Sequence, residues 1–389
     1  MSKRLPLRFG RNEFAGAVGD LGTDVPLLVL LIISCKLDAP SVLMVFGACQ
    51  IFSGFAYRLP IPVQPLKAMA VIAITSKAVD GGMLVDGGML AGGGLAIGAI
   101  MLLLSVTGAV GLIARIVPKA VVRGIQFGLG IKLAMLALGK YLPGSGDLSG
   151  KGLLPGDGAE GYLLAAAAFL IVIALRKSKR FPAALLVLAI GLVYVFALKS
   201  GWAVMGPKMG PSLPVLRAPS WADILLGLVV LAIPQLPLSL GNAVLATSQT
   251  ASDLFPGQRV SPRKLGLTYS ACNLIAPLLG GIPVCHGSGG LVGHYTFGGR
   301  TGGSAIIYGA TFLLCGLVFG QGFFELIRIF PMSLLAVLLL FESIALMRLA
   351  KDMMADAEGF FLVITVGLIA AGLPYGFCIG IVVGVGLHL

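Results

Sequence analysis

The chain alternates between long apolar segments and short polar connections over nearly its whole length. We predict that the apolar segments are membrane-spanning helices, because a helix needs about 20 mostly apolar residues to cross the hydrocarbon core. They lie at about 14–35, 39–57, 65–78, 90–114, 118–138, 161–175, 183–199, 222–248, 266–280, 287–297, 302–321, 323–349, 359–373 and 375–388. The pattern therefore predicts an all-α polytopic membrane protein with about 14 transmembrane segments, several of them short.

Composition excludes an ordinary soluble domain. Of the 389 residues, 57% are hydrophobic and only 11% are charged. Soluble domains carry about 25% charged residues, so most of this chain is expected to be surrounded by lipid. We expect a multi-pass protein of the cell membrane, that is, the plasma or inner membrane.

The net charge is +12, and most of the basic residues lie in the loops between the apolar segments. With a cytoplasmic N-terminus, the loops assigned to the inside hold 18 of the 28 Lys and Arg residues, and those assigned to the outside hold 8. Such a bias is the positive-inside rule, which explains the charge without a nucleic-acid partner. It predicts that both termini are cytoplasmic.

Three landmarks recur in the same order in the two halves of the chain. They are Gly19-Asp20 with Gly241-Asn242, Pro62–Pro65 with Pro283–His286, and Leu112–Pro118 with Leu326–Pro331. The first two pairs are offset by 222 and 221 residues. With seven spans in each half, the second copy must be inserted upside down relative to the first, as in many secondary transporters. We predict a 7+7 inverted repeat, with halves at 1–200 and 201–389.

The apolar pattern breaks at two equivalent places, residues 59–68 and 280–290. Prolines keep the first break extended, and glycines and a proline mark the second. Irregular backbone at membrane depth is tolerated only where it is buried in protein or lines a cavity. We predict that segments 3 and 10 are half-helices, each preceded by a short extended strand. In an inverted repeat their N-termini face each other and favour a small anion.

Gln64 and Lys67 lie at the first predicted helix mouth, as a hydrogen-bond donor and a fixed positive charge. A lysine at membrane depth costs about 2.5–3.5 kcal/mol on insertion scales, which makes it a functional candidate. The alternative is that Lys67 pairs with Asp20 or extends to the interface.

The second predicted mouth contains the run Cys285, His286, Gly287, Ser288 and Gly289. The glycines permit close approach of a ligand to the backbone, and Ser288 adds a hydroxyl donor. His286 either donates to the anion or caps the helix. Cys285 either contacts the anion or is a small packing residue.

Polar residues inside the first and eighth spans complete the candidate substrate site, because such residues usually face a cavity or another helix. The donors are Thr23, Gln235, Ser239 and Asn242. Asp20 and Asp24 accept hydrogen bonds when ionised, so one of them is assigned to a proton or to Lys67. Glu342 in the twelfth span is a further proton candidate, unless it pairs within the bundle.

Other classes of site find little support. The Gly-x-Ser-x-Gly elbow of esterases and the Walker A sequence are missing, so we expect neither catalysis nor ATP coupling. The three histidines are too few and too badly spaced for a metal site, and the six cysteines show no paired spacing. No cofactor is expected.

At the two breaks the chain resembles the molybdate transporter family, a relative of the sulfate permease superfamily. The resemblance rests on Pro-Val-Gln-Pro-Leu-Lys-Ala at 62–68 and on the glycine-rich stretch 281–300, and extends over nearly the whole chain. Leu66 stands where the family pattern leads us to expect methionine, and Thr296 where it leads us to expect arginine. The chain stops at Leu389, without the cytoplasmic regulatory domain of sulfate permeases, which favours the molybdate branch.

The resemblance implies a core domain at about 14–114 plus 222–321 and a gate domain at about 115–200 plus 322–389. It also implies uptake of an oxyanion, with molybdate as substrate and tungstate or sulfate as further candidates. We therefore expect a secondary transporter that works by alternating access between core and gate. The alternatives are a transporter of sulfate or another anion, an anion channel and a nucleobase permease of similar fold. The sequence does not determine the oligomeric state, and a homodimer is one candidate.

Overall fold

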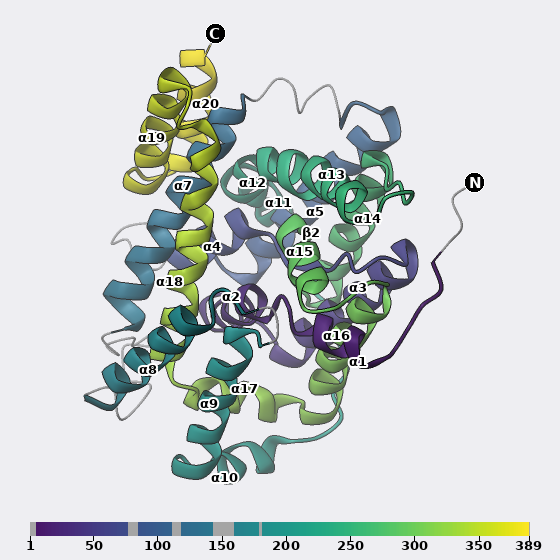
Figure 1. Cartoon of the computed structure of the whole chain (residues 1–389), viewed down its shortest axis with the longest axis vertical. Helices are drawn as coiled ribbons and strands as arrows, with labels where there is room; N and C mark the ends of the chain where they lie inside the picture. The colour runs from purple at the N-terminus through teal and green to yellow at the C-terminus, as the bar shows by residue number, and fades with distance from the viewer. Residues whose placement is uncertain (1–4, 77–84, 111–117, 143–158, 179–180, 389) are drawn as a thin grey trace.

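The computed structural model describes residues 5–76, 85–110, 118–142, 159–178 and 181–388 (Figure 1). Residues 112–117 of the third repeat landmark lie outside this described part. The described chain is helical apart from two short strands. The elements are α1 (Arg11–Ala17), α2 (Leu21–Ser34), α3 (Ala39–Tyr57), β1 (Val63–Pro65), α4 (Lys67–Thr75), α5 (Gly87–Thr107), α7 (Lys119–Leu136), η2 (Ala137–Tyr141), α8 (Ala159–Leu175), α9 (Ala183–Leu198), α10 (Gly201–Met205), η3 (Gly206–Lys208), α11 (Trp221–Gly227), η4 (Leu228–Ala232), α12 (Ile233–Leu238), η5 (Ser239–Ala246), α13 (Thr247–Leu254), α14 (Pro262–Ile275), η6 (Ala276–Leu279), β2 (Val284–His286), α15 (Ser288–Thr296), α16 (Gly303–Leu314), η7 (Cys315–Phe319), α17 (Gln321–Ile329), α18 (Met332–Arg348), η8 (Leu349–Met353), α19 (Ala357–Gly372) and α20 (Gly376–His388).

Five helices of the described chain are long and apolar enough to cross a membrane, or up to eight if each bent pair counts as one span. Three shorter apolar helices accompany them. Large apolar side chains on the outer faces of α8, α9 and α19 are exposed, among them Leu170, Val193 and Phe361. Such faces suit a lipid environment. Fourteen crossings remain a prediction.

Two predicted spans have different boundaries in the structure. The first is broken at residues 18–20, where α1 and α2 meet at a bend of 45°. The segment expected at 323–349 is two helices, because Pro331 lies between them and starts α18 from its N-cap position. Helical geometry is disfavoured for the residue that precedes a proline. Phe330, which precedes Pro331, has extended backbone geometry.

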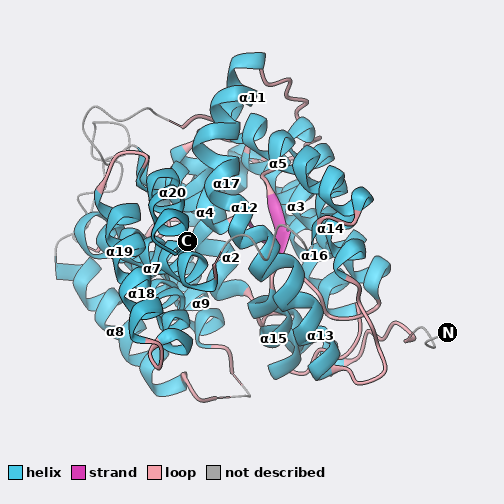
Figure 2. Cartoon of the chain, turned by 90° about the horizontal axis from the view of Figure 1, so that it is seen from above, coloured by secondary structure: helices cyan, strands magenta, loops and turns pink. Residues whose placement is uncertain are grey.

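The helices form two groups, which lie on opposite sides in both views (Figures 1 and 2). We call α3, α5, α11, α14 and α16 the first bundle, because α3 packs on α16 and α5 packs on α11 and α14. We call α7, α8, α18, α19 and α20 the second bundle, because α7 packs on α18, α19 and α20, and α18 on α8. Helices α2 and α4 contact each other and lie between the bundles, α2 against α18 and α4 against α7.

The strands β1 and β2 join the two halves of the sequence. They pair antiparallel, with Val63 opposite His286, Gln64 opposite Cys285 and Pro65 opposite Val284. Each strand is also held by a buried amide side chain from its own half. Gln50 bonds both the N–H and the C=O of Val63, at 2.8 and 2.6 Å, and Asn273 bonds the same two groups of Val284, at 2.9 and 2.6 Å.

These side-chain bonds satisfy backbone groups that two three-residue strands cannot satisfy alone. Gln50 lies 13 residues before Val63, and Asn273 lies 11 residues before Val284. The two halves therefore hold their extended segments in the same way, which places the N-termini of α4 and α15 on either side of one small ladder.

Candidate functional site

A cavity of about 260 Å³ lies at the starts of α4 and α15. A water molecule needs about 10–15 Å³ by a comparable measure, so the space is large enough for a small anion together with several waters. Its lining comes from both halves of the chain and from both strands of the ladder. The lining residues are Gly19, Asp20, Thr23, Gln64, Lys67, Gln126, Gln235, Leu238, Asn242, Ala243, Cys285, Ser288, Gly289, Glu342, Ala345, Leu346 and Leu349.

Alternation along the strands decides which strand residues reach the cavity. Successive side chains of a strand point to opposite faces, and Gln64 is paired directly with Cys285. Both of these side chains line the cavity. The neighbouring His286 points the other way, where its Nε2 lies 2.7 Å from Thr268 Oγ1 and its ring packs edge-on against Tyr57.

Lys67, the first residue of α4, reaches across the cavity to α18. Its Nζ lies 2.5 Å from Glu342 Oε1, and Thr23 donates from Oγ1 to Glu342 Oε2 at 3.1 Å. The side chains of Lys67 and Glu342 are 17% and 12% exposed, so this is a largely buried ion pair. It connects a helix next to the ladder with the second bundle.

The first-turn amides of α4 are already engaged. Gln235 Oε1 accepts from the backbone N–H of Ala68 at 2.8 Å and of Met69 at 3.3 Å. Gln235 therefore acts as a helix cap supplied by another helix, a role that side-chain oxygens commonly fill. We expected these amides to be available to an anion, and this expectation is wrong for Ala68 and Met69.

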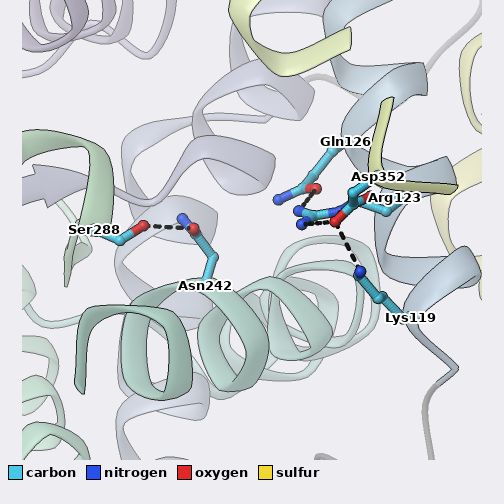
Figure 3. A network of polar contacts seen from close by, with 6 residues as sticks. All are labelled: Lys119, Arg123, Gln126, Asn242, Ser288 and Asp352. Atoms are coloured by element: carbon cyan, nitrogen blue, oxygen red, sulfur yellow. Dashed lines mark hydrogen bonds and ion pairs between the residues drawn. The ribbon is translucent and has the colours of Figure 1, made fainter. Parts of the chain in front are cut away.

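The start of α15 is more open. Ser288 donates from Oγ to Asn242 Oδ1 at 3.0 Å (Figure 3). Within residues 287–297, which follow β2 and are all described, the first amide with a bonded backbone acceptor is that of Leu291, which donates to Gly287. A methyl group placed on Gly289 would meet no heavy atom within 4 Å. The first turn of α15 thus presents backbone donors and empty space to the cavity.

Asp20 and Gln64 form another polar contact of the cavity wall. Gln64 Nε2 donates to Asp20 Oδ1 at 2.8 Å and to Oδ2 at 2.6 Å. Both side chains are buried. Two glycines of the α15 start make room for them, because a Cβ on Gly287 would overlap Gln64 Oε1 and one on Gly290 would lie 2.3 Å from Asp20 Oδ2.

Four of the predicted site residues do not line the cavity. His286 points to the far side of the ladder, and Gly287 faces Gln64 instead. Ser239 lies one position beyond the face formed by Gln235, Leu238 and Asn242, and its hydroxyl bonds Tyr269 at 2.7 Å. Asp24 is buried one helical turn beyond Asp20 and accepts a hydrogen bond from Tyr308 at 3.1 Å.

The structure also identifies the partner of Lys67. The sequence left open whether Asp20 or Asp24 carries a proton or pairs with Lys67, and the ion pair of Lys67 is with Glu342. Thr23, Gln64, Lys67, Gln235, Asn242, Cys285, Ser288 and Gly289 do line the cavity, as do Asp20 and Glu342.

Sequence reasoning missed Gln126 and a set of apolar residues on the second-bundle side. Gln126 lies on α7, is buried and faces the cavity. The sequence feature that could have identified Gln126 is a polar side chain inside a predicted span, because such a residue usually faces a cavity or another helix. Ala345, Leu346 and Leu349 carry no such signal, because apolar residues in a span look alike whether they face lipid or a cavity.

The wall chemistry suits an anion bound by hydrogen bonds. Asn242 uses its amide oxygen on Ser288, and Gln126 uses its amide oxygen on Arg123 at 2.9 Å, so both amide nitrogens remain as donors. Lys67 adds a positive charge, balanced by Glu342. Among the residues that the structure describes, no three His, Cys, Asp or Glu side chains are grouped to hold a metal ion.

Solved structures with the same fold confirm a helical membrane protein. The transmembrane domain of a cyanobacterium bicarbonate transporter, BicA, aligns with a TM-score of 0.67 at 20% identity, over 95% of this chain and 99% of that one. Murine Solute Carrier 26 family member A9, titled an anion transporter in the inward-facing state, aligns with a TM-score of 0.69 at 14% identity, over 97% of this chain and 67% of that one. At these identities the likeness concerns the fold.

Relatives at the sequence level are closer. Molybdate transporter 2 of Arabidopsis thaliana is 34% identical over 95% of this chain and 86% of its own length. Molybdate transporter 1 of Chlamydomonas reinhardtii is 28% identical over 95% of this chain and 90% of its own length. The sequence model described as "Molybdate transporter of MFS superfamily" matches residues 12–133 and 227–346. The resemblance noted at the two breaks is thereby confirmed, and the chain belongs to the molybdate transporter family.

Proposed function

We propose that this protein is a secondary transporter of a tetrahedral oxyanion, with molybdate as the first candidate, and that the anion binds in the cavity at the starts of α4 and α15. The observation that carries the proposal is the wall of that cavity. Its donors come from a helix N-terminus, two oriented amide side chains and a lysine, and they converge on a space of about 260 Å³. The names of the relatives point to the same substrate class.

Charge balance links anion binding to a proton. A dianion entering the cavity meets the carboxyl groups of Asp20 and Glu342 as well as Lys67. Protonation of Glu342 removes a negative charge and frees Lys67 Nζ to turn toward the anion, while Thr23 still bonds the carboxyl group. Like charges at close range would otherwise cost several kcal/mol in a water-poor site. We assign the coupling proton to Glu342.

Alternating access would come from movement between the two groups of helices. In this proposal the first bundle, with β1, β2, α4, α12 and α15, is the core that carries the anion, and the second bundle is the gate. Helices α4 and α15 would be the half-helices of a seven-plus-seven inverted repeat. The family match in each half and the equivalent roles of Gln50 and Asn273 support this repeat. Both termini would be cytoplasmic, in the cell membrane.

Tungstate and sulfate share the charge and shape of molybdate, so the site is expected to accept them to different degrees. A nucleobase permease would need a carboxylate at the helix mouths to pair with the base. Asp20 and Glu342 do line the cavity, but Asp20 is engaged by Gln64, and Glu342 by Lys67 and Thr23. These bonds favour the oxyanion.

Uptake into proteoliposomes tests the proposal. Purified protein should take up labelled molybdate saturably, and an inward proton gradient should accelerate the uptake. Current that does not saturate with molybdate concentration would instead identify an anion channel. Uptake of uracil without uptake of molybdate, tungstate or sulfate would contradict the substrate class.

A further inference from the structure

Gln126 is the polar residue of the cavity wall that the sequence did not bring into the site. It lies on α7, in the second bundle, and only 1% of its surface is exposed. The other wall residues on this side are Glu342, Ala345 and Leu346 of α18 and Leu349 of η8. Because Glu342 is the acceptor of an ion pair and the other three are apolar, Gln126 is the hydrogen-bond donor that the described part of the second bundle supplies to the cavity.

The orientation of the Gln126 amide is fixed by a hydrogen bond on the side away from the cavity. Its Oε1 accepts from Arg123 Nη1 at 2.9 Å, one turn earlier on α7. Arg123 is itself held by Asp352, through Nη2 at 2.6 Å and Nε at 3.1 Å. Lys119 adds a second cation 2.9 Å from the same carboxylate. With its oxygen bound to a guanidinium group, the amide can present only its N–H₂ end to the cavity.

Across the cavity, Asn242 is arranged in the same manner. Its Oδ1 accepts from Ser288 Oγ, so its amide nitrogen is likewise the free end. Figure 3 shows the nitrogen end of Gln126 directed toward the side of the cavity where Asn242 and Ser288 lie, with Arg123 and Asp352 behind it. One amide belongs to the anion-carrying side and the other to the second bundle.

We propose that Gln126 is a binding and specificity residue that donates a hydrogen bond to the oxyanion from the second bundle, and that Arg123 and Asp352 are positioning residues that hold its amide in the donating orientation. This inference rests on the proposed function. It means that the anion bridges the two bundles when both face the cavity, so that loading of the site and the relative position of the bundles are coupled.

Equilibrium binding of labelled molybdate to purified protein tests this role. Gln126→Leu should weaken binding about 10- to 100-fold, the effect of one hydrogen bond to a charged group. Gln126→Glu, which keeps the size of the side chain but replaces the donor, should weaken it at least as much. Gln249→Leu is the matched control, because Gln249 on α13 is exposed and bonds Asp253 away from the cavity. It should bind as wild type does.

A double-mutant cycle separates positioning from general structure. Arg123→Ala should weaken binding in the wild-type background and add little in the Gln126→Leu background, since both changes remove the same donor. Thermal midpoints of the purified variants check that each one is folded. Unchanged affinity in both Gln126 variants, or additive effects of Arg123→Ala and Gln126→Leu, would overturn the inference while leaving the proposed function standing. Failure of the wild-type protein to bind any oxyanion would overturn both.

Discussion

Lys67 and Glu342 are 275 residues apart in sequence and form an ion pair of 2.5 Å at the wall of the cavity. Lys67 begins the helix that follows β1, and Glu342 lies on α18 of the second bundle. The pair therefore links the helix next to the ladder with that bundle, at the place where the proposed anion and the coupling proton would meet. Each partner compensates a charge that would be costly to bury alone.

Removing one partner should be costly for stability, and removing both should be less so. Lys67→Met leaves Glu342 without its counter-ion, which typically costs about 3–5 kcal/mol for a buried pair. The thermal midpoint of the purified variant should fall, and the double variant Lys67→Met/Glu342→Met should recover much of the loss. Neither variant should bind molybdate well. A double variant no more stable than Lys67→Met would show that the pair does not act as a unit.

Glu342→Gln should separate anion binding from proton coupling. The amide mimics a protonated carboxyl group, so Lys67 is released and molybdate affinity should be kept or increased. Uptake driven by a proton gradient should lose its dependence on pH, whereas wild-type uptake should slow as pH rises. Proteoliposome uptake at several pH values measures this. Wild-type pH dependence in Glu342→Gln would assign the proton elsewhere.

Asp20 is expected to anchor Gln64 and not to carry the coupling proton. Asp20→Asn keeps an oxygen that accepts from Gln64 Nε2, so proton-driven uptake should persist. Asp20→Ala removes that anchor and should weaken molybdate binding about ten-fold, the order expected for a lost hydrogen bond. If Asp20→Asn binds molybdate but no longer responds to a proton gradient, Asp20 is the carrier and the assignment to Glu342 is wrong.

Alanine substitutions of the neighbouring Gly289 and Gly290 at the start of α15 should have different effects, the first on molybdate affinity and the second on stability. A methyl on Gly289 enters open space beside the cavity, so Gly289→Ala should fold normally and reduce molybdate affinity. A methyl on Gly290 lies 2.3 Å from Asp20 Oδ2 and 2.6 Å from Pro62 Cγ. Gly290→Ala should therefore destabilise the protein by about 1–3 kcal/mol, the usual cost of overpacking. Thermal midpoints and binding titrations of both variants measure the contrast, and equal stability losses would contradict it.

The ladder depends on Gln50 and Asn273. Replacing either by leucine leaves a buried N–H and C=O without their side-chain partner, at about 1–3 kcal/mol for each unsatisfied group. Gln50→Leu and Asn273→Leu should both lower the thermal midpoint, and by similar amounts if the two halves are equivalent. Gln249→Leu on the exposed face of α13 is again the control. A loss in only one of the two variants would argue against equivalent halves.

The breaks in the apolar pattern were readable because proline and glycine change the backbone directly. The breaks at residues 59–68 and 280–290 located β1 and β2 and the starts of two helices, and most of the polar residues singled out there line one cavity. Partners across the fold could not be read in the same way. The capping of Ala68 by Gln235 and the pairing of Lys67 with Glu342 depend on helix positions that no local pattern specifies.

The direction of individual side chains was the other feature that could not be predicted from the sequence. His286 and Cys285 are adjacent, and only the register of the ladder decides that Cys285 faces the cavity. A one-residue shift in register would exchange them. Gln126 was not predicted as a site residue, because the repeat landmarks indicated four other spans. The landmark next to α7 ends before the helix begins, so it did not point to a residue within the helix. The bend of 102° between α16 and α17 lies close to the boundary expected between the segments 302–321 and 323–349.

The most direct measurement is an equilibrium titration of the purified protein with molybdate, tungstate, sulfate and uracil, carried out on wild type and on Asn242→Leu. We predict saturable binding of molybdate and tungstate to wild type, no binding of uracil, and a loss of oxyanion affinity in Asn242→Leu while its thermal midpoint stays near that of wild type. Binding of uracil without binding of the dianions, or oxyanion affinity that Asn242→Leu leaves unchanged, would contradict an oxyanion site in this cavity.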